Sequence, residues 1–522
     1  MAKSGIYRKI GSASLIMMTS IFLSRFMGLF REMTIAAVGG ADMAVDAYRV
    51  AFVLPEILNH VLASGFLSVT FIPILADYLT KNDEEGAWHI FSIILTIFGS
   101  FLILLITIAI IFAPQLVAIM TPGRNDPTFQ AMAVRMTRII LPAQFFFFCG
   151  SLFMAVQFVR ERFSIPALAP LFYNLGIIIC GLILGPVIGM EGFCWGVLAG
   201  AFFGSFIIQW YGSYKSGLKL HICFDLLHPD LKRYVLLTLP LMLGLTMTFS
   251  TEIFSKFFGS FLPEGAISWV DYAMRVMLML VAFFGQAVGV ASYPFLAKLA
   301  AERRMEELNQ VLNNTMRYLA LVIPISMLFI VLRREIVIIL FQRGNFTPLD
   351  SAMTASVLGT LLIGAVAFAA QTVVNRGFYA TENTLFPAVF GTISVVLSLP
   401  IYWFGITLFG AVGLGMAIAF SAILQVLLLF YLWNRKSANH DSGQVYTFYL
   451  KVILVTLPLG AVLYGAHFLM ELTVASNSFT AAIVTSLVIG ICFFIMAAMA
   501  AKIFHIREVL NLWKKIYRKI KR

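Results

Sequence analysis

Charged side chains are scarce in this sequence, which limits how much of its surface can face water. Asp, Glu, Lys and Arg make up 12% of the 522 residues, against about 25% in average soluble domains, while hydrophobic residues make up 60%. Long uncharged runs stand in their place. The stretches 90–120 and 479–501 are each longer than the ~20 residues that cross the hydrocarbon core of a bilayer. The composition excludes an ordinary soluble domain and indicates a polytopic membrane protein.

Paired cysteines and catalytic motifs are also missing. The sequence has no Walker phosphate loop, no HExxH zinc motif and no acidic pair of the kind that metal-dependent glycosyltransferases use. These absences argue against an enzyme and predict no cofactor and no metal. A transporter without a nucleotide-binding site would be driven by an ion gradient or by the membrane potential. The cysteines show no CxxC spacing and are interpreted as buried thiols: Cys149, Cys180, Cys194, Cys223 and Cys492.

The apolar segments predict an all-α membrane protein of about 14 transmembrane helices. The first segment contains charges and no small-residue cleavage site, so we interpret it as a retained helix rather than a signal peptide. The predicted spans are 12–38, 43–80, 87–120, 130–159, 165–187, 191–214, 231–260, 266–297, 309–341, 350–378, 385–406, 410–433, 447–470 and 478–503.

The net charge of +12 is explained by the positions of the basic residues. Most Lys and Arg fall before the first span, in the even-numbered connections and in the C-terminal tail; the opposite loops hold only Arg124, Arg333, Arg334 and Arg343. Because Lys and Arg concentrate in cytoplasmic loops, both termini are predicted to be cytoplasmic. The surplus is therefore a topology signal and does not indicate nucleic-acid binding.

An internal repeat recurs 221 positions along the chain. Proline and glycine positions carry it, and these residues constrain the backbone at helix ends. The matching pairs include Pro73 and Pro294, Gly123 and Gly344, Pro127 and Pro348, Pro166 and Pro387, Gly189 and Gly410, and Gly192 and Gly413. Six helices per repeat predict two parallel repeats that alternate access by rocking against each other; a duplicated scaffold without a moving cleft is the alternative.

The repeat divides the chain into four predicted parts. Residues 1–225 form an N-lobe with helices 1–6, and residues 226–436 form a C-lobe with helices 7–12. Residues 437–503 carry two extra helices. Residues 504–522 form a basic amphipathic cytoplasmic tail suited to anionic lipid headgroups.

Ionisable residues at membrane depth cluster in three predicted helices. Such residues cost at least ~2.5–3.5 kcal/mol on insertion scales, so they need partners or a wet cavity. In the first helix Arg25, Gly28 and Glu32 share a face, and Arg31 lies on the neighbouring stripe. In the second helix, Asp46, Arg49, Glu56 and His60 are spaced at intervals that place them on one helix face, with Asn59 next to them. In the eighth helix, Asp271, Arg275 and Gln286 share a face.

The choice of arginine indicates the kind of ligand. Its planar guanidinium binds phosphate oxygens in pairs, whereas a pump for protons or organic cations would place unpaired carboxylates there. We therefore predict a cavity for an anionic, phosphorylated headgroup, with charges from both repeats facing it. Simple structural ion pairing remains the alternative for any single pair.

The segment 24–32 reads Ser-Arg-Phe-Met-Gly-Leu-Phe-Arg-Glu. It resembles the first-helix signature of the MurJ family, the lipid II flippases of the MOP exporter superfamily. The resemblance covers nearly the whole chain. Further matching segments are Asp46-Ala47, Val50-Ala51-Phe52, Leu54-Pro55, Arg162-Phe163-Ser164-Ile165-Pro166-Ala167 and Leu340-Phe341-Gln342-Arg343-Gly344.

The resemblance implies a bacterial inner-membrane protein that flips undecaprenyl-pyrophosphate-linked disaccharide-pentapeptide, lipid II, outward for peptidoglycan synthesis. It implies that Arg25, Arg31 and Arg275 hold the headgroup and that Asp46 is an acidic cavity position. The last two helices would form a groove for the polyprenyl tail. The protein is expected to act as a monomer, with cell-wall synthesis proteins as further candidate partners.

Two positions depart from the family pattern. The family usually has arginine at the position of Asn59 and a basic residue at that of His60, and Arg49 is the candidate to replace that charge. Some relatives have a sodium site where this chain carries Ser255 and Tyr402, which speaks against sodium coupling. Glu252 and Lys256, one turn apart, are interpreted as a local pair.

Three other functions stay open at this level. A flippase for another lipid-linked oligosaccharide, of the capsule or O-antigen type, would explain Asn59. A cation-coupled multidrug antiporter conflicts with an arginine-rich cleft. A scaffold for cell-wall synthesis leaves the charges inside the membrane unexplained.

Overall fold

The computed structural model describes residues 2–62, 70–245, 250–383, 385–473 and 478–504, and every regular element in these ranges is a helix. The chain forms two compact units, Met1–Gly265 and Ala266–Arg522. The first unit includes the helices of the predicted seventh span, so the packing boundary lies later than the repeat boundary at 225. The four predicted parts are defined by the repeat and remain a prediction.

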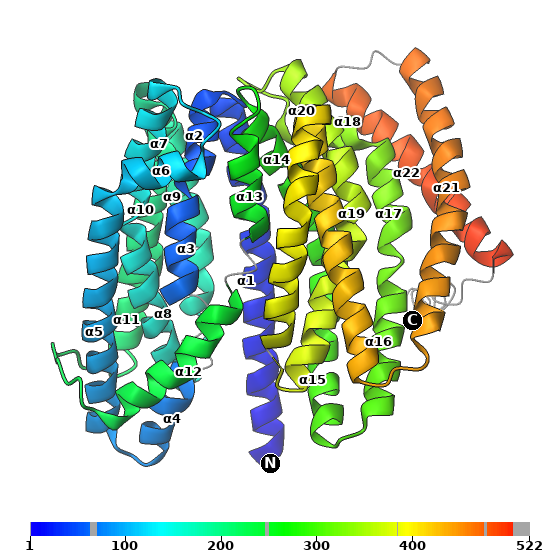
Figure 1. Ribbon diagram of the computed structural model, residues 1–522. Coiled ribbons are helices and arrows are strands. Elements are labelled where there is room, and N and C mark those ends of the chain that lie inside the picture. Colours follow the sequence, from blue (N-terminus) through cyan, green and yellow to red (C-terminus); the bar gives the residue numbers. More distant parts are fainter. Residues whose placement is uncertain (1, 63–69, 246–249, 384, 474–477, 505–522) are drawn as a thin grey trace. The chain divides into compact units, whose positions relative to one another are not determined.

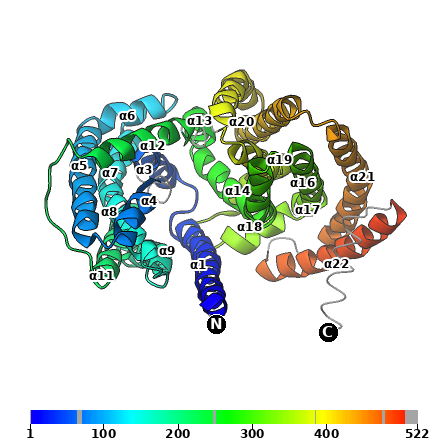
Figure 2. The same ribbon diagram turned by 90° about the horizontal axis from the view of Figure 1, so that it is seen from below.

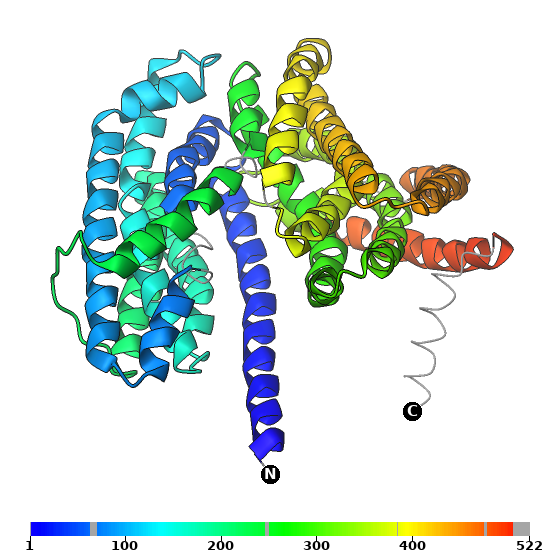
Figure 3. The same ribbon diagram turned by 60° about the horizontal axis from the view of Figure 1, so that its bottom comes forward.

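The first unit is a helical bundle in which α5, α8 and α11 run side by side (Figure 1). Helix α12 crosses α3 and α5 obliquely (Figure 3). Its elements are α1 (Ala2–Gly39), α2 (Met43–Ala51), α3 (Val53–Leu62), α4 (Ile72–Thr80), α5 (Glu84–Ile111), α6 (Ala113–Met120), α7 (Pro127–Ile140), α8 (Ala143–Val159), η2 (Pro166–Leu168), α9 (Ala169–Ile188), α10 (Glu191–Gly200), η3 (Ala201–Ile207), α11 (Ile208–Tyr214), α12 (Pro229–Leu245) and α13 (Ser250–Gly259).

The second unit is built around the long helices α19 and α20, and α22 crosses α21 at its edge (Figure 2). Its elements are α14 (Ala266–Val281), η4 (Ala282–Gln286), α15 (Ala287–Ala301), α16 (Met305–Leu319), α17 (Val322–Val331), α18 (Arg333–Phe341), α19 (Pro348–Ala380), α20 (Leu385–Lys436), α21 (Ser442–Thr473) and α22 (Phe479–Ile503).

Ten helical segments in the described part of the chain are long and apolar enough to cross a membrane. They cover eleven of the fourteen predicted spans, because α20 joins the eleventh and twelfth across a kink at Gly410. The predicted spans 12–38, 43–80 and 231–260 are not among the ten, and the last two include undescribed residues. The all-α membrane class is confirmed, and the number fourteen stays a prediction.

The backbone repeats the 221-residue offset of the sequence. Residues with a positive φ angle, which most side chains avoid, occur at matched positions of the two repeats. The pairs are Asn82 (58°) and Arg303 (58°), Glu161 (57°) and Glu382 (58°), Gly189 (61°) and Gly410 (58°), and Gly217 (93°) and Ala438 (50°). The same turns therefore end corresponding helices even where the residue types differ.

Glycines allow α9 and α10 of the first unit to pack closely against each other. A Cβ atom added to Gly176 of α9 would stand 2.7 Å from the Cα atom of Gly200 in α10, and one added to Gly196 would stand 2.7 Å from the Cα atom of Ile177. Membrane helices rely on such small residues because lipid supplies no hydrophobic force between them. Outward side chains such as Val187 and Leu408 are apolar and 81% and 70% exposed, as expected of a surface in contact with lipid.

Candidate functional site

A buried charge network links α1 to α2 in the first unit. Glu32 accepts hydrogen bonds from Arg31 Nη2 and from Arg49 Nη2, each at 2.7 Å. The side chains of Glu32 and Arg49 are 3% exposed, and that of Arg31 is 18% exposed. Arg31 Nη1 also donates to Asn174 Oδ1 of α9 at 3.1 Å. These three ionised side chains together carry one positive charge more than negative.

Asp46 is not part of this network, and its carboxylate forms hydrogen bonds with two loops. Its Oδ2 accepts from Arg124 Nη1 at 3.1 Å and from the amide of Gly265 at 2.8 Å. Arg124 Nη2 donates in turn to the carbonyl of Leu262 at 2.9 Å. Since Asp46 is fully buried, this tie fixes the start of α2 to the loops after α6 and α13. The predicted role of Asp46 in shaping a cavity remains a prediction.

The other predicted residues of α1 and α3 border more open space. Arg25 is exposed, and no described heavy atom lies within 4 Å of a Cβ added to Gly28. Glu56 and Asn59 are half-buried on α3. The side chain of His60 lies outside the described residues.

In the second unit, Arg275 and Asp271 lie one turn apart in α14. Arg275 Nε donates to Asp271 Oδ2 at 3.0 Å, with the arginine 33% and the aspartate 6% exposed. The side chain of Gln286, in η4, is not described.

In α13 of the first unit, Lys256 and Glu252 form the predicted local pair, with Lys256 Nζ 3.7 Å from Glu252 Oε1.

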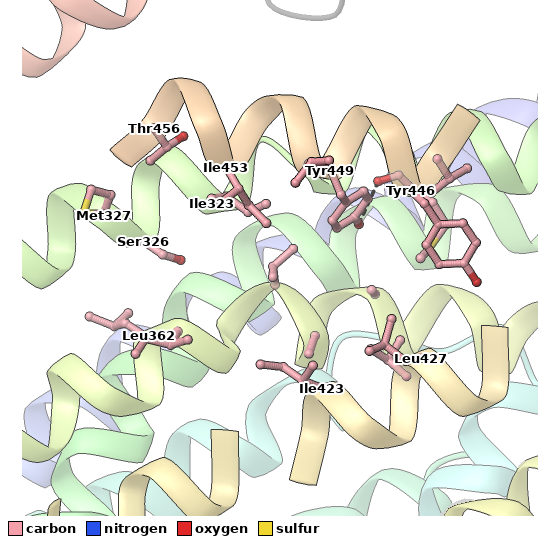
Figure 4. Close-up of a pocket in the computed structure, with 18 of the residues that line it drawn as sticks. Ile323, Ser326, Met327, Leu362, Ile423, Leu427, Tyr446, Tyr449, Ile453 and Thr456 are labelled. Atoms are coloured by element: carbon pink, nitrogen blue, oxygen red, sulfur yellow. Dashed lines mark hydrogen bonds between the residues drawn. The ribbon is translucent and has the colours of Figure 1, made fainter. Parts of the chain in front are cut away.

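A large apolar cavity lies within the second unit. Its volume is about 710 Å³, and it is bounded by α16, α17, α19, α20 and α21. Figure 4 shows Tyr449 and Ile453 of α21 facing Ile423 and Leu427 of α20 across it. Among the described residues Ser326 Oγ is buried without a hydrogen-bond partner at its wall. Helix α22 supplies none of the lining residues, so α21 alone of the two extra helices forms a wall.

Sequence patterns do not identify Arg124 and Asn174 as partners of the predicted site residues. Arg124 pairs with Asp46 across 78 residues and Asn174 with Arg31 across 143. No local spacing signals such contacts, because they depend on how separate helices pack.

One further ionisable cluster ties α21 to α18. His467 Nε2 of α21 lies 2.8 Å from Glu335 Oε1 of α18, and Glu471 lies close enough to complete a three-ligand group. Arg334 Nη1 stands 3.4 Å from Glu471 Oε1. Because an arginine already neutralises Glu471, we interpret the cluster as a link between helices rather than a metal site.

The fold is similar to those of two solved structures. A solved structure described as the inward-facing conformation of a multidrug resistance MATE family transporter of the MOP superfamily matches with a TM-score of 0.66 and 16% identity, over 80% of this chain and 94% of that one. The structure of "Lipid II flippase MurJ, inward closed conformation" matches with a TM-score of 0.75 and 21% identity, over 94% of this chain and 99% of that one. The class of fold is thus the one that these two structures share.

Sequence comparison places the chain within that class. The family model "Lipid II flippase MurJ" matches residues 35–485, and the chain belongs to this family. The "Probable lipid II flippase MurJ" of Buchnera aphidicola subsp. Acyrthosiphon pisum (strain APS) is 27% identical over 454 residues, which is 86% of this chain and 88% of that protein. The family is one of multi-pass membrane transporters rather than enzymes.

Proposed function

We propose that this protein flips lipid II across the cytoplasmic membrane by alternating access, holding its pyrophosphate in an arginine-lined cavity. Membership of the MurJ family supports the substrate. The observation that carries the mechanism is the buried group of Arg31, Glu32 and Arg49, in which two guanidinium groups share one carboxylate.

An anionic headgroup suits this arrangement electrostatically. The net positive charge of the three side chains is costly at membrane depth, and a pyrophosphate would offset it. Arg25 lies two turns before Glu32 on the same face of α1, beside the open space at Gly28. Arg275 of α14 is the headgroup contact proposed for the second repeat, with Asp271 holding its guanidinium.

The apolar cavity beside α21 is proposed to take part of the polyprenyl tail. Its lining is almost wholly aliphatic and aromatic, and an isoprenoid chain gains ~25 cal/mol for each Å² of apolar surface it buries. This assigns the tail site to α21 and the helices it faces.

The membrane potential is proposed as the driving force. The two positions where relatives would bind sodium carry hydroxyl side chains here. Ser255 Oγ donates to the carbonyl of Glu252 at 2.8 Å, and Tyr402 is 1% exposed within α20. Neither provides the carboxylate that a sodium ion would favour.

The arginines give the first test. Arg25→Ala, Arg31→Ala and Arg275→Ala should each abolish complementation in a flippase-depleted cell, because each removes a phosphate contact. Expression of each variant and its accumulation in the membrane are measured in parallel. Arg135→Ala is the matched control, since Arg135 forms an exposed pair with Glu191. Full complementation by all three variants would exclude arginine anchoring.

The cavity gives the second test. Ser326→Phe fills the apolar space and should lower the rate at which labelled lipid II changes its headgroup accessibility in proteoliposomes. Ser356→Phe adds the same ring to an exposed position of α19 and should leave the rate unchanged. Equal rates for both variants, with equal melting temperatures, would remove the tail-site assignment.

A flippase for another lipid-linked oligosaccharide is the second candidate. Asn59, half-buried on α3, stands where the family resemblance predicts an arginine. The same proteoliposomes distinguish the candidates, since a capsule or O-antigen lipid would then be flipped faster than lipid II. Efflux of organic cations in place of either lipid would instead indicate a multidrug antiporter.

A further inference from the structure

Three of the seven histidines of the chain gather at one end of the first unit, outside the charge network described above. His89 lies near the start of α5, whereas His221 and His228 lie in the segment between α11 and α12. The rings of His89 and His221 are stacked with centroids 5.6 Å apart, and the His228 ring lies 5.9 Å from that of His89. Residues more than 130 positions apart therefore bring three imidazoles together.

The distance between the first two rings has a specific meaning. His89 Nδ1 and His221 Nε2 are 3.4 Å apart. Two histidine nitrogens bound at about 2.0–2.1 Å to one tetrahedral zinc ion stand about 3.3–3.4 Å from each other. The separation of the two nitrogens is therefore the one that a zinc chelate requires.

These two nitrogens form a hydrogen bond with each other, which a bound cation would replace, and further contacts orient the rings of His221 and His228. His221 is held by its own amide, which donates to Ser92 Oγ at 3.3 Å, and its Nδ1 lies 3.5 Å from the same hydroxyl. His228 Nδ1 accepts from the amide of Asp230 at 3.2 Å, which leaves Nε2 as its ligand atom. Such second contacts set which nitrogen faces a metal.

We propose that His89 and His221 bind a first-row divalent cation of the Zn²⁺ class, with His228 as a third ligand after a side-chain rotation and water in the remaining position. Imidazole ligands suit zinc, copper and nickel rather than magnesium or calcium. The bound ion fixes the segment 219–228, which leads into α12, to the start of α5. The site is independent of the proposed flippase activity.

Zinc binding to the full-length protein tests the site. The protein is purified in detergent with an affinity tag that contains no histidine and is titrated with ZnCl₂ by calorimetry. One ion per chain is expected, and zinc should raise the melting temperature. His89→Gln and His221→Gln should each weaken binding at least tenfold, while their melting temperatures without zinc match the wild type.

His440→Gln is the matched control, because His440 is an exposed histidine of the second unit. It should bind zinc like the wild type. No zinc binding by the wild type, or equal binding by the His89→Gln/His221→Gln double variant, would overturn the proposal.

Discussion

At the scale of single residues, the protein concentrates charge where each group has a defined neighbour. Glu32 contacts two arginines from different helices, and Asp46 contacts Arg124 and the amide of Gly265. Removing one member of a buried ion pair leaves the other charge uncompensated, which costs more than the pair contributed. The two carboxylates therefore hold helices and loops in place as well as setting the local potential.

Glu32→Gln tests this at the residue scale. It should lower the stability in detergent by about 3–5 kcal/mol, because Arg31 and Arg49 lose their shared carboxylate. The midpoint of thermal or denaturant unfolding measures the change. Glu84→Gln, which removes an exposed pair with Arg160, should cost about 0–1 kcal/mol. Equal losses in both variants would mean that the network carries no special stability.

At the scale of elements, α21 spans the apolar cavity and is held on both sides of it. Tyr449 OH donates to the carbonyl of Met316 at 3.0 Å, and eighteen residues later His467 contacts Glu335 at 2.8 Å. Apolar clusters support both contacts, one around Phe448 and Val452 and the other around Leu459 and Leu463. The helix thus forms a wall whose attachment depends on a few polar contacts.

His467→Ala should loosen the α18 end of this wall. The change leaves the buried Glu335 carboxylate without a hydrogen-bond partner that it has in the wild type, at a cost of about 1–3 kcal/mol. Hydrogen–deuterium exchange of residues 459–472 should become faster, whereas His440→Ala should leave it unchanged. His467→Gln, which keeps a donor, should restore part of the protection. Unchanged exchange in His467→Ala would show that apolar packing alone holds α21.

Sequence patterns predicted most of the long helices because apolar length is a local property. They did not predict the break between α7 and α8 beside Pro142, whereas the corresponding span of the second repeat, 350–378, forms the continuous helix α19 as predicted. The 221-residue offset aligns Ala143 with Gly364, and Gly364 lies against Ala419. Whether a helix breaks at such a point depends on the neighbour it packs against, which periodicity does not contain.

At the scale of the whole molecule, two compact units share one duplicated plan, and both present apolar surface outward. The matched positive-φ turns show that the duplication determines where helices end. The distribution of basic residues then predicts which ends face the cytoplasm.

Topology can be tested with two cysteines in a variant that lacks the native ones. Asn125→Cys and Ala438→Cys are both at exposed positions of connecting segments. An impermeant maleimide applied to intact spheroplasts should label Asn125→Cys and not Ala438→Cys, and inverted vesicles should give the reverse. Labelling of both from one side would contradict the predicted cytoplasmic termini.

The membrane class, the internal duplication and the candidate arginines follow from the amino-acid sequence, because hydropathy, helix-end residues and charge are properties of positions along the chain. The contact of Arg31 with Asn174, the link that Asp46 makes between loops and the apolar cavity beside α21 arise only when the helices pack. The histidine cluster likewise appears only on folding. Each of these depends on contacts between residues far apart in sequence, and such contacts are set by how the helices pack.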